Sequence, residues 1–200
     1  YDALTGLPNR RLLHERLQHA MSSSKRSGLR VAVLFLDLDN FKTLNDSRGH
    51  AVGDLLLVEV ARRLQASVRE QDTVARLGGD EFVIMLTGIE HTTVIGMVAE
   101  KIVKTVGAPY VIEGRDLYTS PSIGIAIFPT DGDSGNTLMK NADAAMYHAK
   151  NAGRNNFQFF DAKMNQAAVE RLKIEHSLRQ ALANDEFCLH FQPIIDATSG

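Results

Sequence analysis

The stretch that decides the fold reads Arg76-Leu77-Gly78-Gly79-Asp80-Glu81-Phe82-Val83-Ile84. Its glycine pair separates two apolar, strand-like segments, and glycine accepts the positive φ angles that a tight hairpin needs at its central positions. The hairpin is predicted to place Asp80 and Glu81 side by side at one end of a sheet. Adjacent carboxylates repel each other, and a cation or a proton-transfer role would compensate. A solvated acidic turn is the plainer alternative, because acidic hairpins are common.

A second acidic segment follows a buried strand. Residues 31–36 are continuously apolar and rich in β-branched side chains, which predicts a strand buried on both faces. Asp37 and Asp39 come at its end, and their i, i+2 spacing places both on one face. We interpret Asp37 as a metal ligand, since acids at the end of a buried strand often form ligand sites. For Asp39 we favour another role, in which it or Asn40 caps a helical turn over 41–45.

The composition describes an ordinary globular chain. Of its 200 residues, 44% are hydrophobic and 23% charged, which suits one domain, or one domain and a piece of another. A net charge of −2 provides no basic field, so we expect no contact with nucleic acid or with a membrane. The single cysteine, Cys188, excludes an internal disulfide and fits a reducing, cytoplasmic compartment. Because the chain begins at Tyr1, we expect it to be part of a longer protein that could be membrane-anchored.

Periodicity and turn signals predict the elements. Helices are expected over 10–24, 41–45, 52–67, 92–106 and 138–152, and strands over 30–37, 73–77, 82–86, 110–112, 119–128 and 156–160. A hairpin interrupts the alternation of strands and helices. We therefore expect an α/β (α+β) fold with a mixed, mostly antiparallel central sheet flanked by helices, like a nucleotide-cyclase or polymerase palm. The composition changes near Asp161, which predicts one domain over 1–160 and a separate segment over 161–200.

Several motifs, in order and at matching spacing, resemble those of the GGDEF domains, which act as diguanylate cyclases. Besides residues 78–82, the motifs are Asp2-Ala3-Leu4-Thr5-Gly6-Leu7-Pro8-Asn9-Arg10-Arg11, Asp37-Leu38-Asp39-Asn40-Phe41-Lys42, Asn45-Asp46, Gly49-His50-Ala51-Val52-Gly53-Asp54 and Lys150-Asn151-Ala152-Gly153-Arg154-Asn155. The resemblance runs from Asp2 to about Phe160. The tail over 187–194 looks like the first strand of an EAL domain, so 161–200 is expected to be a linker helix and the start of a truncated EAL domain.

The resemblance implies an enzyme that condenses two GTP into cyclic di-GMP and releases pyrophosphate. Such nucleotidyl transfer uses Mg²⁺ (or Mn²⁺) to activate the attacking hydroxyl and to neutralise phosphate charge. By this resemblance, Asp37 and Asp80 bind the metal through carboxylates, and Leu38 through its backbone carbonyl. Asp80 also matches the catalytic base. Glu81 is its acidic neighbour and assists with the metal.

The resemblance also assigns residues to the base of GTP. Asn45 and Asp54 match the pair that reads guanine, and His50 matches a further substrate contact. Each has a plainer alternative: Asn45 as a helix C-cap, Asp54 as an acid favoured near a helix N-terminus, and His50 as a turn residue.

Cations and backbone amides are assigned to the triphosphate. Backbone N–H groups near 40–42, including that of Phe41, are expected to cradle phosphate beside Lys42. Lys150 and Arg154, expected on one face of the last helix, match a clamp for the γ-phosphate. The alternative is a pair of ordinary cations near a helix C-terminus.

A regulatory site is implied by Arg69-Glu70-Gln71-Asp72, which precedes the glycine pair at the spacing of the family's inhibitory site for cyclic di-GMP. Arginine can bind phosphate or a guanine face, and aspartate can pair with the guanine edge. The alternative is a surface ion pair between Arg69 and Asp72.

The expected partners are GTP, cyclic di-GMP, an attached EAL domain and a second copy of the chain, since the reaction consumes two GTP. Three alternatives stay open. The first is a non-catalytic GTP-binding GGDEF module that controls an attached EAL phosphodiesterase domain. The second is a cyclase for another purine pair, which Asp54 disfavours. The third is a metal-binding structural domain.

Overall fold

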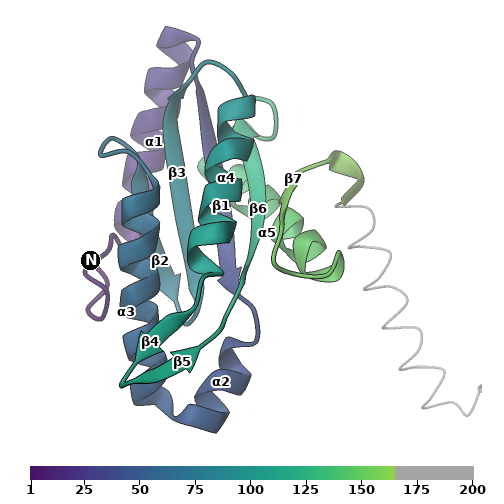
Figure 1. The fold of residues 1–200 in the computed structure, drawn as a ribbon. Coiled ribbons are helices and arrows are strands. Elements are labelled where there is room, and N and C mark those ends of the chain that lie inside the picture. The colour runs from purple at the N-terminus through teal and green to yellow at the C-terminus, as the bar shows by residue number, and fades with distance from the viewer. Residues whose placement is uncertain (165–200) are drawn as a thin grey trace, which may run out of the picture. The chain divides into compact units, whose positions relative to one another are not determined.

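The computed structural model describes residues 1–164 (Figure 1). The EAL-like strand predicted over 187–194 lies outside these residues, as does most of the predicted linker helix. The helices are α1 (Arg10–Ser27), α2 (Phe41–Arg48), α3 (His50–Ser67), α4 (Thr93–Val106) and α5 (Gly135–Asn151). The strands are β1 (Arg30–Leu38), β2 (Thr73–Gly78), β3 (Glu81–Ile89), β4 (Tyr110–Ile112), β5 (Arg115–Leu117), β6 (Pro121–Phe128) and β7 (Phe157–Phe159).

The central sheet has the order β2-β3-β1-β6-β7, and β4 and β5 form a separate hairpin. Strand β1 is antiparallel to both of its neighbours, β2 is antiparallel to β3, and only β7 joins in parallel, beside β6. The predicted mixed, mostly antiparallel sheet is therefore confirmed. Its central strand is the apolar segment that precedes Asp37.

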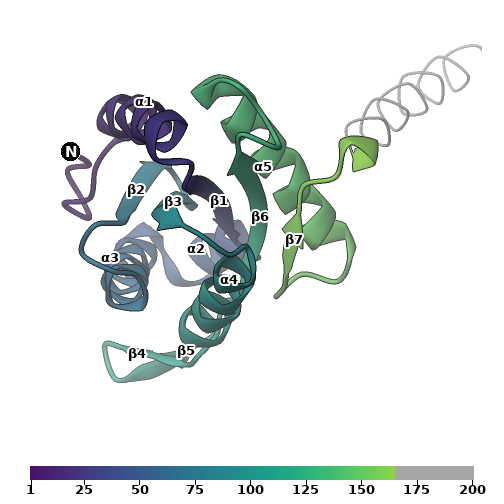
Figure 2. The ribbon, with the colours of Figure 1, turned by 90° about the horizontal axis from the view of Figure 1, so that it is seen from above.

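Helices cover both faces of this sheet. Figure 2 shows α1 and α5 on one side and α3 and α4 on the other. The even-numbered side chains from Ala32 to Leu38 pack in the core beneath α3 and α4, whereas Val31, Val33 and Phe35 pack beneath α1 and α5. This alternation confirms the prediction that β1 is buried on both faces. By the same alternation, Asp37 lies on the face of the sheet that α1 and α5 cover.

Helix α5 lies unusually close to β6, at Gly124. A Cβ atom on this residue would lie 2.0 Å from the carbonyl oxygen of Ala142 and 2.0 Å from the backbone nitrogen of Met146. Only glycine fits such an approach of two backbones. The contact fixes the distance between α5, which carries Lys150, and the sheet.

The observed elements differ from the predicted ones mainly at their ends. Strand β5 was not predicted, and β6 begins at Pro121 rather than at residue 119. The hairpin that joins β4 to β5 turns at Glu113 (φ 51°) and Gly114 (φ 72°). Two positive φ angles are typical of a type I′ turn, but glutamate is an uncommon residue there. Among the described helices, none is long and apolar enough to cross a membrane.

Candidate active site

The hairpin formed by β2 and β3, here called the signature hairpin, differs from the predicted one by one residue. Gly78 pairs with Glu81, so the central turn residues are Gly79 and Asp80 rather than Gly78 and Gly79. Both glycines still need positive φ, 139° for Gly78 beside a register shift and 53° for Gly79 in the turn. Since Glu81 also pairs with Asp37 across β1 and β3, the turn holds Asp80 next to Asp37.

A buried arginine fixes this turn. Arg76 donates to the Gly79 carbonyl oxygen from Nε (3.0 Å) and Nη2 (2.7 Å), and from Nη1 to both carboxylate oxygens of Asp2 (3.0 and 3.2 Å). Burial alone would raise the pKa of Asp2, but hydrogen bonds from Thr5 and Arg76 outweigh it, and the pKa is lowered. Through Arg76, the N-terminal motif that contains Asp2 therefore stabilises the turn at Gly79 and Asp80. Sequence reasoning missed this link, although both partners lie in motifs that it singled out.

At the end of β1, Asp37 meets a cation from α5. The Nζ atom of Lys150 lies 2.7 Å from Asp37 Oδ1. Burial raises the pKa of Asp37, the hydrogen bond from Lys150 opposes that rise, and the charge of Asp80 adds to it. Lys150 therefore balances part of the negative charge that Asp37 and Asp80 concentrate here.

Of the two residues predicted to cap α2, the structure confirms Asn40 and not Asp39. The N-cap of α2 is Asn40, in the left-handed region at φ 59°, and no side-chain hydrogen bond caps the helix. The Asp39 carboxylate instead accepts hydrogen bonds from Ser120 Oγ (2.5 Å), Ser122 Oγ (2.7 Å) and the backbone N–H of Asn155 (3.2 Å). A buried carboxylate needs hydrogen-bond donors, and these three groups supply them, so the Asp39 side chain is not available to cap α2.

Arg154 also departs from its predicted place. Helix α5 ends at Asn151, so Lys150 and Arg154 do not share a helix face. Gly153 (φ 109°) and Arg154 (φ 62°) have positive φ angles, which are incompatible with a continued α-helix, so the chain turns here. The turn nevertheless brings Arg154 Nε to 4.0 Å from Asp39 Oδ1. Each cation of the predicted clamp thus faces one aspartate at the end of β1.

The residues assigned to guanine lie on α2 and α3. The Oδ1 atom of Asn45 is buried without a hydrogen-bond partner among the described residues, and an added Cβ on Gly53 would lie 1.8 Å from it. The C-cap of α2 is Gly49, so Asn45 is not the cap. His50 and Asp54 are exposed in the first turns of α3. An unpaired buried amide oxygen is costly, which makes Asn45 a candidate ligand contact.

Phe41 and Lys42, which are predicted to contact phosphate, differ in exposure. Phe41 begins α2 and its side chain is 7% exposed, in the core shared with α3. Any phosphate contact by Phe41 therefore uses its backbone. Lys42 is exposed on the first turn of α2 and is available to an anion.

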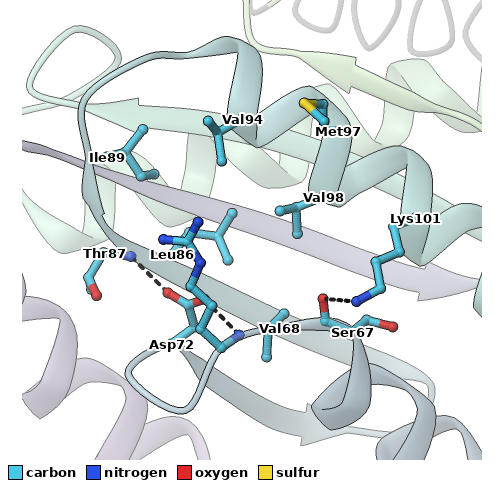
Figure 3. A pocket seen from close by; sticks show the side chains of 11 residues that line it. Ser67, Val68, Asp72, Leu86, Thr87, Ile89, Val94, Met97, Val98 and Lys101 are labelled. Atoms are coloured by element: carbon cyan, nitrogen blue, oxygen red, sulfur yellow. Dashed lines mark hydrogen bonds between the residues drawn. The ribbon is translucent and has the colours of Figure 1, made fainter.

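The predicted inhibitory residues, Arg69 and Asp72, lie in the turn between α3 and β2. Figure 3 shows Asp72 at the pocket beside this turn. The Asp72 carboxylate accepts hydrogen bonds from the backbone N–H groups of Arg69 and Thr87, both at 3.1 Å. Asp72 thus fixes the turn that presents the exposed Arg69 side chain. A pocket of about 590 Å³ opens beside them, and its wall is largely apolar: Val68, Leu86, Ile89, Val94, Met97 and Val98.

Known proteins resemble this chain over its whole length. The chain is 52% identical over 200 residues to the bifunctional diguanylate cyclase/cyclic di-GMP phosphodiesterase MucR of Pseudomonas aeruginosa, covering 100% of this chain and 29% of MucR. It is 38% identical over 200 residues to the cyclic di-GMP phosphodiesterase NbdA of the same species, covering 100% of this chain and 25% of NbdA. The chain therefore spans less than a third of these curated relatives.

Solved structures share the fold. The GGDEF domain of TpbB (YfiN) from P. aeruginosa has a TM-score of 0.82 and 38% identity, covering 84% of this chain and 98% of that chain. The GGDEF domain of DgcB from Caulobacter crescentus, solved in complex with c-di-GMP, has a TM-score of 0.73 and 31% identity, covering 79% of this chain and 94% of that chain. The family described as "Diguanylate cyclase, GGDEF domain" matches residues 1–156. The chain belongs to the GGDEF domain family.

Proposed function

We propose that this chain is a cytoplasmic diguanylate cyclase that condenses two GTP into cyclic di-GMP with release of pyrophosphate. The observation that carries the proposal is the meeting of Asp37 and Asp80 beside Lys150, where the ends of β1 and the signature hairpin coincide. Acids and a cation of this kind suit a triphosphate and its counter-ion. Turnover of GTP by the chain, measured as described below, tests the proposal.

The donor set fits Mg²⁺. Within residues 1–164, no group of three His, Cys, Asp or Glu side chains is arranged to hold a metal ion alone. Mg²⁺ usually takes one or two carboxylates and completes its shell with water and substrate phosphates. Asp37, Asp80 and the Leu38 carbonyl would hold it, with Glu81 assisting. When bound, the metal would lower the pKa of the attacking hydroxyl and neutralise phosphate charge.

The chain's own groups would bind and orient GTP. Asn45 and Asp54 would pair with the guanine edge, and the unpaired Oδ1 of Asn45 supports a role as acceptor. Lys42, Lys150 and Arg154 would bind the phosphates, with His50 as a further contact. To do so, Lys150 must exchange its ion pair with Asp37 for one with phosphate. Asp80 would take the proton of the attacking 3′-hydroxyl.

Catalysis should require two copies of the chain. One set of guanine and phosphate residues binds one GTP, whereas the product contains two guanylate units. We expect the turnover rate per chain to rise with protein concentration and to level off when the dimer is fully formed. Initial rates and sedimentation measured on the same dilution series check this. A rate per chain that stays constant down to concentrations where only monomer sediments would contradict it.

Cyclic di-GMP is the proposed inhibitor at Arg69 and Asp72. The turn is preformed, because Asp72 binds two backbone N–H groups, and a carboxylate still has acceptor positions for a guanine edge. The complex of DgcB with c-di-GMP supports a product site in a domain of this fold. Bound product would restrain the cyclase by coupling between distinct sites.

Arg69→Ala is expected to weaken binding of cyclic di-GMP by about tenfold or more, since arginine contacts to phosphate or guanine contribute roughly 1–3 kcal/mol. Calorimetric titration of the product measures the change. Arg62→Ala is the matched control, because Arg62 is an exposed arginine of α3 that pairs with Glu59. Equal affinities in wild type and Arg69→Ala would show that the pattern occurs here by chance.

The main alternative is a non-catalytic GTP-binding module that regulates an attached EAL phosphodiesterase domain. NbdA, named as a phosphodiesterase, favours it, because its similarity covers the whole of this chain. The intact acidic site favours catalysis instead. GTP binding without turnover separates the alternative from the proposed cyclase.

A further inference from the structure

Asp39 is the most completely bound acid at this end of the sheet, yet it has no role in the proposed chemistry. Its side chain is 3% exposed. Oδ1 accepts from Ser122, and Oδ2 accepts from Ser120 and from the N–H of Asn155. Its backbone N–H donates to the Ser120 carbonyl at 2.8 Å. Because both oxygens are directed at these donors, Asp39 is a poor candidate for a metal ligand.

The segment that Asp39 binds is a strained turn. Gly153, Arg154 and Asn155 have φ angles of 109°, 62° and 49°. Glycine adopts such angles freely, but arginine does so rarely, so contacts elsewhere must hold the turn. The N–H of Arg154 donates to the Ala149 carbonyl at 3.1 Å, and that of Asn155 donates to Asp39. One of these two anchors comes from α5 and the other from the end of β1.

The charge of Asp39 also faces Arg154. Arg154 Nε lies 4.0 Å from Asp39 Oδ1, and the Arg154 side chain is 54% exposed. One side of the guanidinium thus lies near a fixed, buried carboxylate while the remainder faces solvent. A guanidinium has five N–H donors, so this neighbour leaves donors for an anion. Because its three hydrogen bonds fix the Asp39 carboxylate, its charge restricts the orientation of the Arg154 side chain.

We infer that Asp39 is a positioning residue that sets the preference of this site for a nucleoside triphosphate over a diphosphate. It holds the turn through Asn155 and orients the Arg154 guanidinium toward the terminal phosphate. This inference rests on the proposed function, specifically on Arg154 as a phosphate contact. Asp39 acts through Arg154 and does not touch the nucleotide.

The test compares two nucleotides on the full chain by calorimetry with Mg²⁺. One is a GTP analogue with a methylene group between the α- and β-phosphorus, which cannot release pyrophosphate, and the other is GDP. In Asp39→Asn, the amide retains an acceptor for the Asn155 N–H but loses the charge. We expect affinity for the analogue to fall by about tenfold and affinity for GDP to change by less than about twofold. Asp131→Asn alters a partly buried acid that accepts a hydrogen bond from the backbone N–H of Ile127, and it should change neither affinity.

A double-mutant cycle separates positioning from general loosening of the fold. In an Arg154→Met background, Asp39→Asn should no longer alter the ratio of the two affinities, because the residue through which it acts is gone. A change in the ratio that persists in that background contradicts the inference, as does an unchanged ratio in folded Asp39→Asn.

Three further outcomes are informative. If Asp39→Asn does not fold, Ser122→Ala removes one hydrogen bond from the carboxylate and should lower the ratio by about threefold; an unchanged ratio there also overturns the inference. If the wild-type chain binds the analogue no more tightly than GDP, the phosphate clamp of the proposed function is wrong, and the inference falls with it. If the wild type prefers the analogue and the variants keep that preference, only the inference fails.

Discussion

Asp80→Ala is expected to lower the rate of cyclic di-GMP formation by about 10³-fold or more, because it removes a proposed metal ligand and the proposed base together. Its fold should survive. Asp80 lies at a hairpin turn, and its charge raises the pKa of the partly buried Asp37 carboxyl, so its removal relieves repulsion. Product chromatography gives the rate, and thermal unfolding gives the stability.

A matched control for this prediction is Asp133→Ala. Asp133 is exposed in the loop between β6 and α5, outside the helices and strands that carry proposed site residues. It should retain the wild-type rate. Wild-type turnover in a folded Asp80→Ala protein would remove Asp80 from the mechanism.

Gly124→Ala is expected to lower the free energy of unfolding by about 3 kcal/mol or more. The added Cβ would collide with two backbone atoms of α5, and backbone cannot move aside as a flexible side chain can. For a domain of this size, such a loss lowers Tm by roughly 10 °C. Denaturant unfolding followed by circular dichroism measures the loss. If the protein folds, α5 must shift, and the 2.7 Å ion pair between Lys150 and Asp37 is displaced.

Gly96→Ala provides the matched control with the opposite sign. Gly96 lies inside α4, and the nearest atom to an added Cβ is Phe159 Cζ at 4.0 Å. Alanine in an open helical position should stabilise the fold by about 0.4–1 kcal/mol. Equal stability of Gly124→Ala and Gly96→Ala would mean that α5 does not pack against β6 as described.

The main elements of the fold follow from local sequence patterns. The apolar run over 31–36 predicted the central strand, β1, and the glycine pair predicted the hairpin of β2 and β3. All three strands are in the observed sheet. Strand β5 was missed because its turn uses Glu113 at a position where asparagine or aspartate is expected. The equally short β4 was predicted, so the missing turn signal, rather than the length, explains the difference.

The candidate site was less accessible to sequence reasoning. The acids of the signature hairpin could be identified from their type and spacing. The partners of Asp39 could not, because Ser120, Ser122 and Asn155 are distant in sequence and become neighbours only when β6 pairs with β1. For the same reason, the contact of Asp2 with Arg76 was not predicted. Arg154 was misplaced because a helical periodicity was extended past the end of α5.

The most direct test of the central claim is incubation of the chain with GTP and Mg²⁺, followed by chromatography and mass spectrometry of the nucleotides. The account predicts cyclic di-GMP and pyrophosphate from wild type at concentrations that populate the dimer, and none above background from Asp80→Ala. Tight binding of GTP by a folded, dimeric wild-type chain with no cyclic di-GMP formed would contradict it and would identify the domain as a regulatory GTP-binding module.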